Sequence, residues 1–161
     1  MMIFVEGVDG SGKTTLIEQL SNQYISLRVP RVADFEFWQS LICRSKGLNI
    51  LVDRSPMSEY VYRQFDGEVC KFSYDQLRHL LKQSKTIICE SDTAFKDSMN
   101  RGEDNITDVV SSNRLKYLYS VIGQSLVADG VDIIKYNWRF DSPDDVINFI
   151  EGGNNNESGT I

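Results

Sequence analysis

The stretch E-G-V-D-G-S-G-K-T-T, residues 6–15, decides the fold of this chain. Its Gly7-x-x-x-x-Gly12-Lys13-Thr14 spacing is that of a phosphate-binding loop, in which glycines let backbone N–H groups turn inward around a phosphate. Lys13 is expected to reach the β- and γ-phosphates, and the Thr14 hydroxyl to ligate Mg²⁺. The predicted contacts to the phosphates of a nucleoside triphosphate come from Gly7, Gly10, Ser11, Gly12, Lys13, Thr14 and Thr15.

A second polar motif, Asp53-Arg54-Ser55, follows an apolar run at residues 50–52. An acid followed at once by an arginine places a magnesium-side carboxylate, Asp53, next to a phosphate-side cation, Arg54. Both would lie at the C-terminal end of a strand, where ligands bind in open α/β sheets. The Asn-Lys-x-Asp guanine motif of GTPases is absent from the sequence, which argues against that class.

Short apolar runs predict the strands of the sheet. Four of them are too short for helices, and the first three show little alternation, as strands covered on both faces do. They span residues 3–5, 50–52, 86–89 and 131–134. Residues 29–32 are expected to add a fifth strand, which Pro30 would confine to an edge of the sheet.

Segments with helical periodicity lie between these runs. The first covers residues 16–24, after the glycine loop, and the second opens with a capping-box pattern at Ser73. The third spans residues of about 107–128, and the last begins at Ser142-Pro143. Alternating strands and helices predict an α/β fold. Its central parallel β-sheet would have about five strands, flanked by helices on both faces.

Length and composition indicate one domain. A chain of 161 residues favours a single core, here residues 1–151, whereas the polar tail at 152–161 is expected to be disordered. A net charge of −6 argues against a nucleic-acid polymer as partner, and no apolar run is long enough to cross a membrane. The three cysteines form no metal or disulfide pattern, so we expect a reducing, cytoplasmic location.

"FVEGVDGSGKTT" (residues 4–15) together with "LVDRSPMSEYVY" (residues 51–62) resembles the thymidylate kinase family, and more broadly the related deoxynucleoside kinases. "NRGEDNI" (residues 100–106) resembles the arginine-bearing lid of these enzymes, which we place near 96–108. The resemblance spans most of residues 2–151 and implies that the α/β fold is that of the P-loop kinases. It implies ATP and Mg²⁺ as cofactors and small-molecule nucleotides as substrates, and it leaves a homodimer open.

The resemblance also implies roles for single residues. Asp9 would lie near the deoxyribose and the magnesium, Asp53 would join Thr14 on the metal side, and Arg54 would grip the acceptor's monophosphate. Arg101 would close on the transferring phosphoryl group. The implied catalytic residues are Lys13, Arg54, Arg101 and Asp9, and the substrate-binding residues include Ser58 and Tyr62, whose ring would crowd a ribose 2′-hydroxyl.

The sequence departs from the thymidylate kinase pattern at the acceptor side. Ser55 replaces the usual aromatic residue after the arginine, as in deoxynucleoside kinases, and Glu59 stands where an amide is common. Asp34 could be the base that deprotonates a nucleoside 5′-hydroxyl, or a helix N-cap, and we favour the cap. Phe35 and Trp38 could form an aromatic wall for the substrate base, or pack in the core.

These observations predict a deoxynucleoside monophosphate kinase that acts in nucleotide biosynthesis. It would transfer the γ-phosphoryl group of ATP to a dNMP, with a thymidylate-like acceptor favoured, and give a dNDP. One alternative is a deoxynucleoside kinase that phosphorylates a 5′-hydroxyl. Another is a non-catalytic nucleotide-binding module, which would have little need of Asp9, Asp53, Arg54 and Arg101 together.

Overall fold

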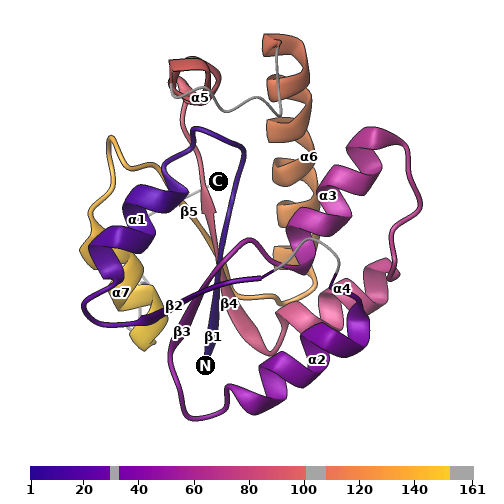
Figure 1. Cartoon of the computed structure of the whole chain (residues 1–161), viewed down its shortest axis with the longest axis vertical. Helices are drawn as coiled ribbons and strands as arrows, with labels where there is room; N and C mark the ends of the chain where they lie inside the picture. Colours follow the sequence, from indigo (N-terminus) through magenta and orange to yellow (C-terminus); the bar gives the residue numbers. More distant parts are fainter. Residues whose placement is uncertain (30–32, 101–107, 153–161) are drawn as a thin grey trace.

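The computed structural model describes residues 1–29, 33–100 and 108–152. A five-stranded sheet in the order β2-β3-β1-β4-β5 forms its centre, and every neighbouring pair is parallel (Figure 1). The strands are β1 (Met2–Glu6), β2 (Ile25–Arg28), β3 (Ile50–Asp53), β4 (Ser84–Cys89) and β5 (Ile133–Tyr136). The predicted α/β fold with a parallel sheet is therefore confirmed, and the C-terminal ends of all its strands meet at one edge.

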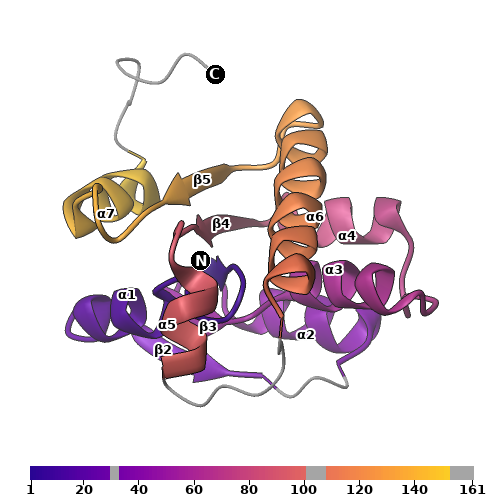
Figure 2. The same ribbon diagram turned by 90° about the horizontal axis from the view of Figure 1, so that it is seen from above.

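Helices cover both faces of the sheet (Figure 2). On one face, α1 (Lys13–Leu20) and α7 (Pro143–Glu151) pack against Ile3, Val5 and neighbouring strand residues. The other face, around Phe4, is covered by α2 (Phe35–Arg44), α3 (Pro56–Asp66), α4 (Tyr74–Leu81) and α6 (Val109–Ala128). Because both faces are covered, β1 is buried along its whole length, as an uninterrupted apolar run predicts.

Two predicted strands lie elsewhere than expected. The edge strand β2 is Ile25–Arg28 rather than residues 29–32, and β5 begins at Ile133 rather than at Val131. All four residues of β2 are exposed, including Ile25 and Leu27, so the strand contributes no buried apolar run of the kind that marks the central strands. Val131 is buried, but its N–H donates to the Leu126 carbonyl at the end of α6, which leaves it outside the strand.

The helix starts follow their capping residues. Ser73 and Gln76 form the predicted capping box of α4, Ser142 caps α7 ahead of Pro143, and Asp108 caps α6. The short helix α5 (Ala94–Asn100) follows β4. Arg101, the core of the predicted lid and the tail beyond Gly152 lie outside the described residues. No helix of the described ranges is both long and apolar enough to span a membrane.

Candidate active site

The predicted phosphate loop connects β1 to α1 at the C-terminal edge of the sheet. Gly7, Gly10 and Gly12 all have positive φ, and the space at Gly10 is closed as well: an added Cβ would lie 1.9 Å from the Ala94 carbonyl oxygen. Only glycine fits such a position without moving the backbone. The loop is therefore built tightly against α5, with the first turn of α1 following it.

Two hydroxyls of the loop fit a bound triphosphate with its metal. The buried Ser11 Oγ has no hydrogen-bond partner among the described residues, and a phosphate oxygen would satisfy it. Thr14 is exposed in the first turn of α1. Within the described ranges no group of three or more His, Cys, Asp or Glu could hold a metal by itself. Mg²⁺ needs only one or two carboxylates when a nucleotide's phosphates supply its other ligands.

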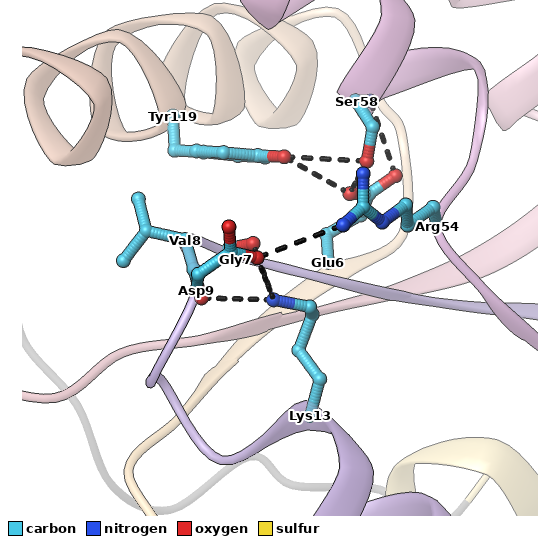
Figure 3. Close-up of polar contacts among 8 residues, drawn as sticks. All are labelled: Glu6, Gly7, Val8, Asp9, Lys13, Arg54, Ser58 and Tyr119. Carbon is cyan, nitrogen blue, oxygen red and sulfur yellow. Dashed lines mark hydrogen bonds and ion pairs between the residues drawn. The ribbon is translucent and has the colours of Figure 1, made fainter. Parts of the chain in front are cut away.

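Lys13 is folded back onto its own loop. Its Nζ donates to the carbonyl oxygens of Gly7 and Val8, at 2.8 Å each, and lies 3.9 Å from Asp9 Oδ1 (Figure 3). Burial lowers the pKa of Lys13, and the nearby Arg54 cation lowers it further, whereas Asp9 opposes the shift. An arriving phosphate would offer the ammonium group a full negative charge in place of two carbonyl dipoles.

Arg54 stands at the end of β3, next to the loop. It is the only non-glycine residue of the described ranges with positive φ, at 72°. Its N–H donates to the Val5 carbonyl at 3.1 Å, and its Nη2 lies 3.6 Å from Asp9 Oδ1 (Figure 3). Such a backbone is unfavourable for a side chain with a Cβ, and it persists only where the surroundings fix it. The adjacency of β1 and β3 brings Arg54 and the loop acid together.

A pocket of about 280 Å³ opens beside Arg54. One face of α3 forms much of its lining, because positions three and four apart lie on the same side of a helix. Glu59 and Arg63 form an ion pair there, with 2.8 Å between Oε1 and Nε. Trp38 from α2 is buried in the wall, and its Nε1 has no partner among the described residues. The full lining is Val29, Ala33, Trp38, Arg54, Ser55, Ser58, Glu59, Tyr62, Arg63, Asp66 and Glu68.

No protein-family model matches the sequence, and no curated protein matches it either. Solved structures do match its fold. The YorR protein from Bacillus subtilis, in complex with phosphorylated GDP, has a TM-score of 0.75 at 18% identity, covering 98% of this chain and 100% of that one. Deoxyadenosine kinase from M. mycoides with bound dCTP has a TM-score of 0.60 at 19% identity, covering 94% and 100%.

The fold is that of a P-loop kinase. In this P-loop kinase fold, the loop and the pocket lie side by side, and Asp9 and Arg54 stand where they meet. Four residues that the sequence assigned to the substrate line the pocket: Trp38, Arg54, Ser58 and Tyr62. Asp53 ends β3 at the same edge of the sheet, and its charge acts on Lys13.

Two other residues considered for the substrate, Phe35 and Asp34, do not line the pocket. The ring of Phe35 lies 6.2 Å from that of His79. Asp34 is the N-cap of α2, where its Oδ1 accepts a hydrogen bond from the Phe37 N–H at 2.9 Å. The favoured interpretation of Asp34 as a helix cap is thus confirmed. Arg101 falls outside the described residues.

Glu6 is a site residue that sequence reasoning missed. It is fully buried, and its carboxylate accepts hydrogen bonds from the Ser58 hydroxyl and, at 3.2 Å, from the Ser58 N–H (Figure 3). It also accepts a hydrogen bond from the Ser55 hydroxyl. The Tyr119 hydroxyl of α6 lies 3.3 Å from Glu6 Oε2. Burial raises the pKa of Glu6, while the serine hydrogen bonds oppose the shift. The only trace in the sequence is an acid that ends an otherwise apolar strand.

Proposed function

We propose that this chain is an ATP-dependent deoxynucleoside monophosphate kinase. The observation that carries the proposal is Arg54, held 3.6 Å from the phosphate-loop Asp9 at the mouth of a pocket. A cation in that position can bind the monophosphate of an acceptor whose base occupies the pocket. A loop that only held ATP would have no use for it.

The reaction joins a phosphate oxygen of the acceptor to the γ-phosphorus of ATP. The bond from that phosphorus to the oxygen bridging it to the β-phosphorus breaks, and ADP leaves with the bond's electrons. The attacking oxygen is already an anion, so alignment and charge neutralisation matter more than a general base. Lys13, Arg54 and the lid residue Arg101 would supply cations, and Thr14 with Asp53 would hold Mg²⁺, which neutralises charge between the donor's phosphates.

The solved structures with this fold support a nucleotide substrate. YorR was solved with phosphorylated GDP, and the deoxyadenosine kinase with dATP, dCTP or dCMP and dCDP. In our proposal the acceptor's sugar lies against Tyr62, whose ring leaves no room for a ribose 2′-hydroxyl. We favour a thymidylate-like acceptor, and every test also includes the deoxynucleoside monophosphates of the other three bases.

Deoxynucleoside kinase activity is the second candidate. Ser55 after Arg54 and the likeness to deoxyadenosine kinase favour it. A 5′-hydroxyl must lose its proton, so this reaction needs a base beside the sugar. Asp34 already accepts the Phe37 N–H as the cap of α2, and the buried carboxylate of Glu6 is occupied by hydroxyl and N–H donors. We therefore rank the monophosphate as the acceptor.

An ADP-release assay with Mg²⁺-ATP tests the proposal against both alternatives. Each common deoxynucleoside and its 5′-monophosphate is supplied in turn, and the ribonucleotides serve as controls for sugar selection. We expect turnover to rise with deoxynucleoside monophosphates only. Turnover with nucleosides alone would establish the second candidate. No stimulation by any acceptor, together with measurable ATP binding, would establish a non-catalytic module.

A further inference from the structure

We infer that Glu6 is a positioning residue for the acceptor phosphate: it fixes the corner between β3 and α3 and so aims the Arg54 guanidinium. The inference rests on the proposed function, because it assigns Arg54 to the acceptor. Glu6 does not line the pocket, so its action on a substrate would pass through Arg54.

Arg54 is fixed on both sides by the last two residues of β1. Its own N–H donates to the Val5 carbonyl at 3.1 Å, and the next residue, Ser55, donates its hydroxyl to Glu6 Oε1. Between these anchors the backbone of Arg54 takes the left-handed conformation. Loss of the second anchor would let this residue relax toward the ordinary regions of φ and ψ, and would carry the guanidinium away from Asp9.

The same carboxylate also fixes the start of α3. Ser55 is the N-cap of this helix, and its Oγ accepts the Met57 N–H at 2.9 Å. Ser58, one turn later, donates both its N–H and its hydroxyl to Glu6. Since Tyr62 and Glu59 follow on the same helix, one buried group sets the register of the pocket-lining face relative to the phosphate loop.

A carboxylate suits this task better than any neutral side chain. It offers acceptor sites on two oxygens, and here Oε1 receives Ser55 and the Ser58 N–H, while Oε2 receives the Ser58 hydroxyl and lies near Tyr119. Glutamine has the same shape but only one acceptor oxygen, and its NH₂ would face hydroxyls that now donate. Glu6→Gln should therefore loosen the corner without emptying the space.

Steady-state kinetics of Glu6→Gln, measured with both substrates varied, test the inference. We expect the KM of the acceptor monophosphate to rise about tenfold, because the loss of one charge-assisted hydrogen bond leaves Arg54 less well fixed. The KM of ATP should change less than about twofold. Glu90→Gln is the matched control, because Glu90 also follows a strand but pairs with Lys135 at 2.9 Å. It should leave both KM values unchanged.

A double-mutant cycle with Arg54→Ala separates positioning from mere structural support. If Glu6 acts through Arg54, Glu6→Gln should have almost no further effect on the acceptor KM once the guanidinium is gone. The same fold-change with and without Arg54 would overturn the inference, and so would an equal rise in both KM values.

Should Glu6→Gln fail to fold, Tyr119→Phe removes one contact at the periphery and should raise only the acceptor KM, by a smaller factor. A wild-type protein inactive with every monophosphate would instead overturn the proposed function, and the inference with it.

Discussion

The phosphate loop and the corner between β3 and α3 are built by opposite means. The loop is a continuous stretch, residues 6–15, whose expected phosphate contacts come largely from backbone N–H groups that glycines make accessible. The corner takes Glu6 from β1, Arg54 from β3, Ser55 and Ser58 from α3 and Tyr119 from α6, and it works through side chains. A backbone site is sensitive to substitution chiefly at its glycines, whereas each contact of a side-chain site can be removed separately. Substitutions in the two regions should therefore give different kinetic signatures.

Lys13→Ala should have the largest effect. Without its ammonium group, charge that develops on the donor phosphates stays uncompensated, so we expect kcat to fall about a thousandfold, whichever acceptor is used. Initial rates of ADP release at saturating substrate measure this. Lys82→Ala, an exposed lysine at the end of α4, is the control. A Lys13→Ala enzyme with near-normal kcat would show that the loop does not hold the donor as assigned.

Arg54→Ala should affect the acceptor side chiefly. Loss of a charge-assisted contact to phosphate costs about 2 kcal/mol, so the acceptor KM should rise roughly thirtyfold while the ATP KM stays nearly constant. Arg78→Ala provides the control, since Arg78 is partly exposed and pairs with Asp75 on α4. Unchanged acceptor kinetics in Arg54→Ala would place the acceptor phosphate elsewhere.

Arg54→Gly separates the backbone of this residue from its charge. Glycine takes a φ of 72° without the steric penalty that alanine suffers. The free energy of unfolding of Arg54→Gly, measured by denaturant titration, should therefore exceed that of Arg54→Ala by about 1 kcal/mol. Both variants should show the same loss of acceptor affinity. Equal stability of the two would mean that the left-handed conformation is not retained in solution.

The smallest expected effect is a pH dependence that Glu6 imposes on stability. Its pKa in the folded protein is raised above the ordinary 4.5, so the native state binds more protons than the unfolded state between that pH and its folded pKa. The contribution of Glu6 to stability is therefore greatest below 4.5 and is lost as the pH rises through the folded pKa. Glu6→Gln lacks this dependence. The unfolding midpoint of the wild type should fall relative to Glu6→Gln as the pH rises above 4.5, whereas a constant difference would contradict the shift.

The sequence allowed the structure of the phosphate loop to be predicted almost completely, because its information is local. Glycines, lysine and threonine at fixed spacing, with a buried run before them and a helix after, suffice. Most strands and the capped helices followed for the same reason. The edge strand β2 was misplaced because it is short and exposed, with no buried apolar run to mark it.

The corner between β3 and α3 was only partly predictable from the sequence. Asp53-Arg54 identified the corner, but nothing local indicates that Glu6 meets Ser55, 49 positions away, or Tyr119, 113 positions away. Those contacts depend on β1 pairing with β3 and on α6 packing against α3. Trp38 lines the pocket, whereas Phe35, one turn earlier at the start of α2, packs beside His79 of α4 instead.

Product identification by ³¹P NMR tests the central claim most directly. The protein is mixed with Mg²⁺-ATP and, in separate samples, with each deoxynucleoside monophosphate or each deoxynucleoside, and the phosphorus signals are followed with time. The account predicts that the β-phosphorus of a deoxynucleoside diphosphate grows in equal amount with ADP. A new monophosphate signal from a nucleoside acceptor, or inorganic phosphate as the sole product, would contradict it.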